Sequence, residues 1–334
     1  MLKYLRKKIF DVNRLFQILL LLTLFLVGGC EKNEIIEPLT NIQKEALNYL
    51  PGESSAVVYL NLEELKKTDF WDSYFKTSLF ENKTDEQRFR KFEKGTGIGL
   101  NNGISQIFIS STGNYRSAAL LILDKNYGNI KNNFDSYGGL IREKINGKSV
   151  YKLNGRFPLQ FYFINDSLLL AADNVNYIKT IINKKNNPLN NNSAFVKTIK
   201  SIRNKKQYWI AADNGEYAVN YIKKFFNFGR KIPANNILNS IESVTLSAKF
   251  DDGLDIDSKL NCSDSKNAYL LSTAIKGALA MDLLSGGDYS FGRILQKTDI
   301  EILNRQVNLQ LELNGDDINI LKDFAKQKKI ERKL

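Results

Sequence analysis

The sequence predicts an α+β protein made of two similar halves, each an antiparallel sheet with helices packed on one face. Three observations predict it. Runs rich in β-branched and aromatic residues come in pairs joined by tight turns, amphipathic helical stretches separate the pairs, and the same order of elements occurs twice. Strands joined by short turns pair antiparallel, because parallel strands need long crossovers, and a sheet buries its apolar face under helices.

The chain divides into six segments by composition and pattern. We predict a signal peptide at 1–29, a lipidated tether and short helix at 30–52, a first α+β unit at 53–185, a linker and helix at 186–204, a second α+β unit at 205–327 and a basic tail at 328–334. Asn41 is the predicted N-cap of the short helix, and Pro51-Gly52 ends it. The asparagine-rich stretch 184–192 predicts the linker.

In the first unit, a strand at 56–60 precedes a helix whose apolar residues recur at helical spacing from Leu62 to Leu79. Asn146-Gly147 between apolar runs is a strong signal for a hairpin. Asn174 is the predicted N-cap of the last helix, which ends at Ile182. The other expected elements are helices at 85–94 and 127–137 and strands at 104–109, 118–123, 140–145, 150–153, 159–164 and 168–172.

The second unit is predicted to repeat this order. The expected elements are helices at 195–202, 215–226, 266–284 and 316–325 and strands at 208–212, 241–250, 254–260, 300–303 and 307–313. Ala172-Asp173-Asn174 before one helix corresponds to Asn314-Gly315-Asp316 before another. Residue identity between the halves is low, so a coincidence of ordinary α+β patterning is the alternative to a true repeat.

The first residues have the pattern of an export signal. Five basic residues and one acidic residue precede an apolar run from Leu15 to Val27, which Gly28-Gly29-Cys30 ends. A basic stretch, a short apolar stretch and small residues form a secretory signal. The apolar run has 13 residues, whereas a membrane-spanning helix needs about 20. An uncleaved anchor helix is therefore the disfavoured alternative.

The segment Val27-Gly28-Gly29-Cys30 resembles the bacterial lipobox, in which small residues precede an obligatory cysteine. The resemblance implies that the Cys30 thiol receives a diacylglycerol and that a signal peptidase, recognising Val27, Gly28 and Gly29, cuts before it. Val27 departs from the leucine that is commonest there. Two or three acyl chains on Cys30 would hold the protein durably in a lipid bilayer, whereas one chain holds a protein weakly.

The residues that follow Cys30 bear on location. Glu31, in place of an aspartate, favours the outer membrane over the inner one, by the sorting rule of Gram-negative lipoproteins. Glu31, Glu34 and Glu37 also give an acidic start that resembles the surface-export signal of some Bacteroidota. We therefore expect a lipid-anchored protein of the cell envelope, in the outer membrane, on its periplasmic or its surface face.

Three further motifs resemble those of uncharacterised bacterial lipoproteins assigned to domains of unknown function. They are the strand Ala56-Val57-Val58-Tyr59-Leu60-Asn61-Leu62, the helix end Phe92-Glu93-Lys94-Gly95-Thr96-Gly97 and the hairpin Gly147-Lys148-Ser149-Val150-Tyr151. The resemblance covers residues 45–215. The motifs are structural, and the family implies no activity.

The composition excludes several kinds of catalysis. The 334 residues include no histidine, which excludes Ser-His-Asp and Cys-His catalysis and histidine-ligated zinc. Lipid is expected on Cys30, so the second cysteine, Cys262, is expected to be a buried small hydrophobe. The net charge is +12, but the lysines are scattered along the chain, so nucleic-acid binding is not expected. An anionic partner is the open alternative.

Several local motifs have both a functional and a structural interpretation, and we prefer the structural one. Gly95–Gly99 follows a helix, whereas a phosphate loop follows a strand and opens a helix. Asp251–Asp257 lacks the spacing of a calcium loop. Ser73–Lys76 and Ser263–Lys266 have Ser-x-x-Lys spacing without the companion motifs of penicillin-binding enzymes. Glu63-Glu64 lies at a helix start, where acids suit the dipole. We expect no catalytic residue, metal or cofactor.

Three functions stay open. The first is a non-enzymatic envelope lipoprotein that binds an unknown protein. The second is a carrier of an apolar ligand against the helix 266–284, whose apolar residues include Ala274, Ile275, Ala278, Leu279, Met281 and Leu283. The third is a histidine-free hydrolase that uses paired carboxylates. A dense aromatic hairpin would be buried between layers or, if exposed, mark a contact surface; its residues are Phe157, Phe161, Tyr162 and Phe163.

Overall fold

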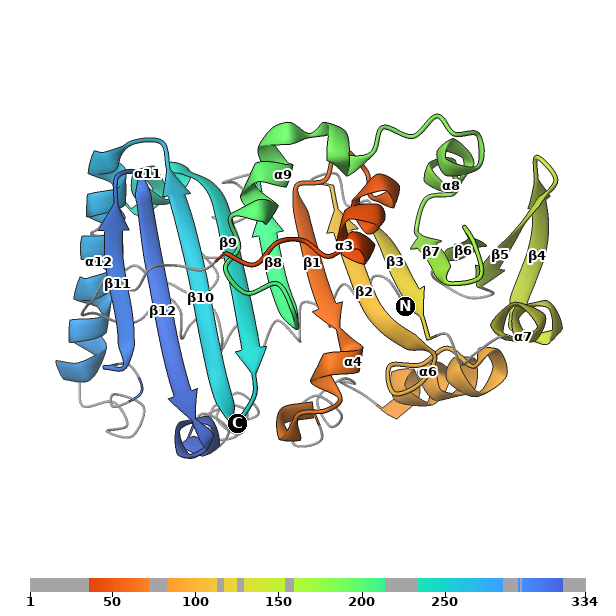
Figure 1. The fold of residues 1–334 in the computed structure, drawn as a ribbon, viewed down its shortest axis with the longest axis horizontal. Coiled ribbons are helices and arrows are strands. Elements are labelled where there is room, and N and C mark those ends of the chain that lie inside the picture. Colours follow the sequence, from red (N-terminus) through yellow and green to blue (C-terminus); the bar gives the residue numbers. More distant parts are fainter. Residues whose placement is uncertain are drawn as a thin grey trace. The chain divides into compact units, whose positions relative to one another are not determined.

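A computed structural model describes residues 36–71, 83–112, 117–124, 129–153, 159–213, 234–284, 294 and 296–320. The predicted signal peptide, the lipobox residues Val27 to Gly29, and Cys30 lie outside these residues. The chain forms two compact units (Figure 1). Unit 1 runs from Pro38 to Lys197, and unit 2 runs from Thr198 onward and includes Glu37.

Unit 1 contains a sheet in which neighbouring strands are antiparallel, in the order β1-β2-β3-β7-β6-β5-β4 (Figure 1). The strands are β1 (Ala56–Asn61), β2 (Ile104–Ser111), β3 (Ser117–Leu123), β4 (Leu140–Ile145), β5 (Lys148–Leu153), β6 (Gln160–Phe163) and β7 (Leu168–Ala172). The helices are α3 (Asn41–Ala46), η1 (Leu47–Tyr49), α4 (Leu62–Leu65), α6 (Lys83–Thr96), α7 (Ile130–Ser136), α8 (Val175–Ile182) and η3 (Leu189–Asn191). The helix α9 (Ser193–Lys200) carries the chain into unit 2.

Local signals place several of these elements where the sequence predicts them. Asn146 and Gly147 both have positive φ, 48° and 76°, and join β4 to β5 in the predicted hairpin. Such a turn matches the twist of the strands that it joins. Asn174 caps α8, and its side chain accepts a hydrogen bond from the Asn176 amide. The predicted α+β class and antiparallel pairing are confirmed.

One local prediction is wrong. The N-cap of α3 is Thr40 and not Asn41, because the Thr40 hydroxyl accepts from the Gln43 amide while the Gln43 side chain accepts from the Thr40 amide. This reciprocal capping box satisfies two amides, which Asn41 alone could not do. The predicted linker starts against unit 1, since Asn186 and Asn190 donate to backbone carbonyls of Asn48 and Lys44 at 3.0 and 3.2 Å. The boundary between the units, after Lys197, lies within the predicted linker and helix at 186–204.

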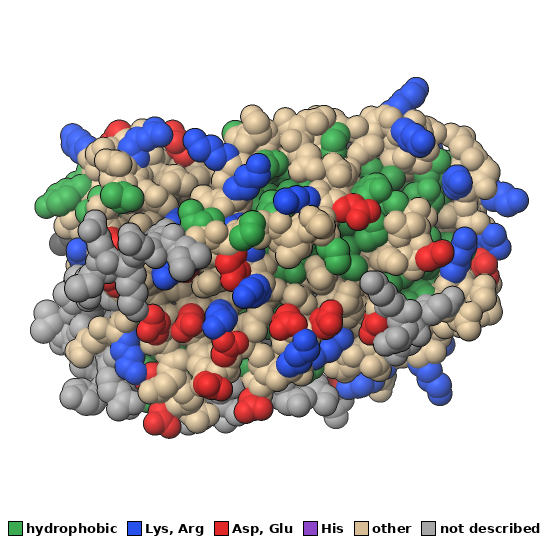
Figure 2. Space-filling view, viewed as in Figure 1, with side chains coloured by type: hydrophobic (Ala, Val, Ile, Leu, Met, Phe, Trp, Pro, Cys, Tyr) green, Lys and Arg blue, Asp and Glu red, His purple; other side chains and the backbone are tan. Residues whose placement is uncertain are grey.

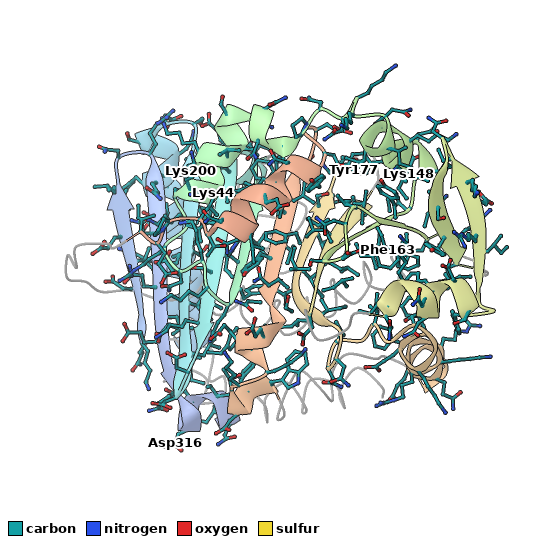
Figure 3. The ribbon with its side chains drawn as sticks, turned by 45° about the vertical axis from the view of Figure 1, so that its right-hand side comes forward. Lys44, Lys148, Phe163, Tyr177, Lys200 and Asp316 are labelled. Atoms are coloured by element: carbon teal, nitrogen blue, oxygen red, sulfur yellow. The ribbon has the colours of Figure 1, made fainter. Side chains whose placement is uncertain are left out.

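One face of the unit 1 sheet lies against α3 and η1. Tyr59, Phe108, Leu120, Leu170 and Tyr162 are paired in succession across five strands, so their side chains share this face. The Gln43 side chain of α3 reaches the Tyr59 hydroxyl. The Tyr177 hydroxyl of α8, labelled in Figure 3, donates to the Tyr49 carbonyl of η1 at 2.7 Å.

The opposite face of this sheet is covered by α6 and α7. Phe92 of α6 stacks on Phe161, with ring centroids 5.6 Å apart. Phe134 of α7 packs edge-on against Phe161 and Phe163, at 5.6 and 5.1 Å (Phe163 is labelled in Figure 3). Helical segments therefore lie on both faces of the unit 1 sheet, and the prediction of helices on one face is wrong here. The reason is β7, Leu-Leu-Leu-Ala-Ala, which is apolar and buried at every position and so must be covered on both sides.

Unit 2 contains antiparallel strands in the order β8-β9-β10-β12-β11 (Figure 1). They are β8 (Tyr208–Ala212), β9 (Ile241–Phe250), β10 (Gly253–Cys262), β11 (Thr298–Leu303) and β12 (Gln306–Asn314). The pairing order matches that of β1, β2, β3, β7 and β6 in unit 1, which adds the hairpin β4–β5. That the two units are similar halves, or repeats, stays a prediction.

Two helices of unit 2 are α11 (Ala234–Asn239) and α12 (Ser265–Leu284). The sequence pattern did not predict α11. The missed α11 is short and polar, which leaves no helical periodicity to read. The predicted helix 215–226 lies outside the described residues. The predicted helix at 316–325 is helical over its described part, 315–320, and Asn314 caps it by accepting from the Asp317 amide at 3.0 Å.

The unit 2 sheet is amphipathic. Leu246, Ala248 and Phe250 alternate with polar residues along β9, and the last two pair with Ile256 and Leu254 of β10. The helix α12 buries its own apolar residues Ala268, Leu271 and Ile275 and packs against β10, β11 and β12. These side chains form part of the core of unit 2. Their burial stabilises the fold by roughly 25 cal/mol for each Å² of apolar surface removed from water.

A buried lysine ties the incoming chain to unit 2. Lys205 is 2% exposed, and its ammonium donates to the backbone carbonyls of Glu37 at 2.6 Å, of Lys200 at 3.0 Å and of Ile202. The Lys205 amide donates to the Glu37 carboxylate at 2.8 Å. We call these contacts the Lys205–Glu37 clamp. Burial lowers the pKa of Lys205 to about 8, because an ammonium in a poorly solvated site loses hydration.

We predict that Lys205→Met destabilises unit 2 by about 3 kcal/mol, because it leaves three buried backbone carbonyls without their side-chain donor. Urea unfolding followed by Trp209 fluorescence, in a Trp71→Phe background, measures the change. The matched control is Lys206→Met: this neighbour is exposed and 3.4 Å from the same carboxylate, so it should cost about 0.5 kcal/mol or less. Equal losses in the two variants would contradict the clamp.

The same variant has an expected pH signature. Between pH 8 and the ordinary lysine value of 10.5, the unfolded chain binds more protons than the folded one. The free energy of unfolding should therefore rise with pH across this window in the parent protein. Lys205→Met should lack this part of the rise, whereas Lys206→Met should keep it. Below pH 8 the group is protonated in both states and adds no pH dependence.

Candidate functional site

Large apolar side chains are exposed on two elements of unit 2. Ile302 and Leu303 of β11 are 39% and 58% exposed, and Tyr269 and Leu270 of α12 are 62% and 37% exposed. Figure 2 shows hydrophobic side chains at the surface over the end of unit 2 where β11, β12 and α12 lie. Single exposed apolar residues are ordinary, whereas groups of them mark contact sites. We call these four residues the β11–α12 surface.

Hydrogen bonds hold the β11–β12 turn against the start of α12. The Cys262 amide donates to the Arg305 carbonyl at 2.8 Å, and the Arg305 guanidinium donates to the Ser263 carbonyl at 3.2 Å. Asn304 accommodates the tight turn with a φ of 56°. The helix α12 also packs directly against β11. The two elements are therefore held against each other.

The strand β11 ends the strand order of unit 2, and among the described strands it pairs only with β12. No described strand pairs with the backbone N–H and C=O groups of its other edge. Sheet proteins usually protect such an edge with lysine, proline or a bulge. The six residues of β11, Thr-Asp-Ile-Glu-Ile-Leu, include no lysine or proline, and their pairing with β12 has no bulge.

The strand β4 at the end of the unit 1 order provides a contrast. Its sequence Leu-Ile-Arg-Glu-Lys-Ile carries Arg142, Glu143 and Lys144, all exposed. Arg142 also forms an ion pair with Asp135 of α7 at 2.9 Å. Charges of both signs make β4 a poor template for another strand, whereas β11 carries acidic residues alone.

Acidic side chains line one face of β11. Asp299 and Glu301 alternate with Ile300 and Ile302, so the acids share one face and the isoleucines the other. The Asp299 Oδ1 atom is buried and has no hydrogen-bond partner. A buried carboxylate oxygen without a donor is costly. The strand therefore has an acidic face, on which the Asp299 Oδ1 atom lacks a donor, and an isoleucine face.

The glycine-rich segment Gly95–Gly99 is a helix end, as predicted, and not a phosphate loop. The helix α6 ends at Thr96, and Gly97 follows with a φ of 76° while its amide donates to the Glu93 carbonyl at 2.8 Å. Gly99 lies against the Glu93 carboxylate, where a Cβ atom would come within 1.8 Å of Oε1. That carboxylate occupies the space that a phosphate would need.

Near this loop, the structure brings together Glu93 and Lys66, a pair of charged residues that no sequence motif predicted. Burial raises the pKa of the Glu93 carboxyl and lowers the pKa of the Lys66 ammonium, and each group acts electrostatically on the other. The Lys66 ammonium donates to the Ile104 carbonyl at 3.1 Å. Displaced pKa values can mark functional sites. Here Lys66 supports the start of β2 and Glu93 packs on Gly99, which is a structural arrangement.

The acidic stretch Asp251–Asp257 lies on the β9–β10 turn and the strand after it. Asp255 stands directly opposite Glu312 of β12 and Lys249 of β9, and burial and Glu312 raise its pKa. Asp255 and Glu312 are both exposed on the sheet surface, so this carboxyl pair is not enclosed as a hydrolase site would be. Among the described residues, no group of acidic or cysteine side chains could hold a metal ion.

The structure describes only part of the other predicted sites. In α12, Ile275 is buried and Ala274 half-buried, whereas the side chains from Ala278 to Leu284 lie outside the described residues, so the carrier hypothesis stays a prediction. In the aromatic hairpin, Phe161 is buried and Tyr162 and Phe163 are half-buried. Phe157 and Ser73–Lys76 lie outside the described residues.

Among the residues that the structure describes, no helix is both long and apolar enough to cross a bilayer.

The hydroxyl of Ser263, the serine of the second Ser-x-x-Lys motif, takes part in two hydrogen bonds. The Ser263 hydroxyl donates to the Asp264 carboxylate at 3.1 Å and accepts from the Asn267 side chain at 3.2 Å. The Asp264 side chain accepts from the Asn267 amide at 2.8 Å, which caps α12. Glu63 and Glu64 lie in the first turn of α4, as the helix dipole favours. Both motifs therefore have structural roles.

Comparisons with known proteins found little similarity. No protein-family model matches the chain, and no curated protein matches it. One similar solved structure, of a T. pallidum protein, is titled "Structure of crystal form I of TP0453". The two chains are 9% identical, the TM-score is 0.46, and the match covers 84% of this chain and 96% of that one.

We predict that Cys262 does not react with thiol reagents in the native protein at pH 8. The side chain is 1% exposed, and burial raises its pKa to about 11, whereas the thiolate is the reacting form. Labelling with iodoacetamide followed by mass spectrometry should therefore modify Cys262 only in urea. Labelling within minutes in the native state would show that this cysteine is accessible.

Proposed function

We propose that the protein is a lipid-anchored, non-enzymatic module of the cell envelope that binds a partner protein through the β11–α12 surface. The observation that carries the proposal is the group of exposed apolar side chains on α12 and on β11, the last strand in the order of the described strands. The absence of histidine from the sequence and the structural roles of Glu93 and Ser263 favour binding over catalysis.

The anchor in this proposal is acylated Cys30, in the outer membrane. Glu37, held by the Lys205–Glu37 clamp, follows Cys30 by seven residues. An extended chain spans at most about 3.6 Å per residue, so the clamp would stand no more than about 25 Å from the lipid-modified residue. Unit 2 and its surface would thus work close to the bilayer, where a partner meets them at a high effective concentration.

The anchor is tested with the two cysteines of the chain. We expect Cys30→Ala to abolish fatty-acid labelling and to move the protein out of the membrane fraction of its host. Cys262→Ala is the matched control and should keep both the label and the membrane association. Persistent labelling of Cys30→Ala would refute the lipid anchor, and with it this localisation.

The binding surface is tested by site-specific photo-cross-linking in intact host cells. A photoreactive amino acid at Leu303 should give a discrete adduct of defined mass. The control places the same photoreactive amino acid at position 141 of β4 and should give no adduct. Ile141 is 47% exposed and also lies on a terminal strand. If position 303 gives no adduct, or if positions 303 and 141 give the same adducts, the β11–α12 surface is rejected as the contact site.

A further inference from the structure

The edge strand β11 has chemistry that selects a kind of partner. One face of the strand carries Ile300 and Ile302, and Ile302 is 39% exposed. The other face carries Asp299 and Glu301. A strand added to this edge would place its own side chains directly beside these two sets, because residues opposite each other in a ladder share a face.

A second copy of this chain fits the edge poorly. A two-fold symmetric pair of strands is antiparallel, since the same patch must face itself. Pairing β11 with itself so that like faces meet sets Ile300 opposite Ile300 or Ile302, and it then sets Asp299 opposite Glu301 or Glu301 opposite Glu301. Like charges directly opposite each other destabilise a sheet. Charge complementarity therefore favours a different chain.

The buried oxygen of Asp299 indicates the complementary group. Its Oδ1 atom lacks a hydrogen-bond partner, so a lysine or arginine side chain on the added strand would supply a missing donor and an opposite charge. Charge-assisted hydrogen bonds of this kind are stronger than neutral ones. The opposite face of the added strand would need apolar residues to cover Ile302.

We propose that β11 receives an extended segment of a partner protein in which basic and apolar residues alternate. The segment extends the unit 2 sheet by one strand; its basic residues face Asp299 and Glu301, and its apolar residues cover Ile302 beside α12. This inference rests on the proposed function and names the chemistry of the partner.

The test uses the full chain in a neutral detergent and three fluorescent, end-capped peptides of equal length. One alternates lysine and isoleucine, one alternates glutamate and isoleucine, and one has the lysines and isoleucines in separate blocks. We expect the alternating lysine peptide to bind about tenfold more tightly than either of the others, a ratio that about 1.4 kcal/mol produces. Equal binding of the lysine and glutamate peptides would overturn the inference.

Variants distinguish strand addition from general attraction between charges. The double variant Asp299→Asn/Glu301→Gln should lose most of the tenfold preference, whereas Glu143→Gln on β4 should keep it. Ile302→Lys should weaken all binding of the lysine peptide. Binding to the detergent alone is the same for every variant and cancels from these comparisons. A preference that survives the double variant would place the peptide elsewhere on the protein.

Hydrogen exchange shows where the peptide binds. Added lysine peptide should slow amide exchange at residues 298–303 and leave β4 at 140–145 unchanged, since only a paired strand protects these amides. Unchanged exchange at β11 would overturn strand addition. If the cross-link at position 303 forms in cells but the peptides do not bind, the proposed binding module is supported and the addition of a strand to β11 is refuted. If the cross-link also fails, the proposed function falls as well.

Discussion

The buried ammonium of Lys205 is the interaction on which the proposed role of the protein depends. It gathers carbonyls from Glu37, Lys200 and Ile202 around one charge and so joins the incoming chain to the segment that leads into β8. A buried charge is tolerated only when its hydrogen-bond donors are satisfied, and here three acceptors do so. If Cys30 carries lipid, this clamp is where force on the anchor would reach the folded protein.

The two terminal strands β4 and β11 show how differently an exposed edge can be treated. β4 carries Arg142 and Lys144, and an ion pair to α7 holds it in place. β11 has acids on one face and exposed isoleucine and leucine at its end. An unpaired strand edge carries a risk of aggregation, and the proposed partner segment would cover that edge of β11.

The core of unit 1 shows why helices lie on both faces of its sheet. The neighbouring residues Phe161 and Tyr162 of β6 point to opposite faces, and each finds aromatic or helical cover: Phe92 and Phe134 on one side, η1 on the other. Aromatic pairs of this kind add about 0.5–1.5 kcal/mol each beyond the burial of area. The described aromatic residues of this hairpin, Phe161 to Phe163, are therefore buried or half-buried.

The sequence by itself determined the elements whose signals are local. Asn146-Gly147 requires a tight hairpin, and Asn174 caps α8. The apolar run of β7 and the alternating pattern of β9 place strands at 168–172 and 241–250. Each signal depends only on neighbours along the chain. Only the tertiary structure decided the Lys205–Glu37 clamp, the packing of Asn190 on η1, and the position of β11 at the end of its sheet. These depend on contacts between residues far apart in the chain, and the pattern of a strand is the same whether it lies at a centre or at an edge.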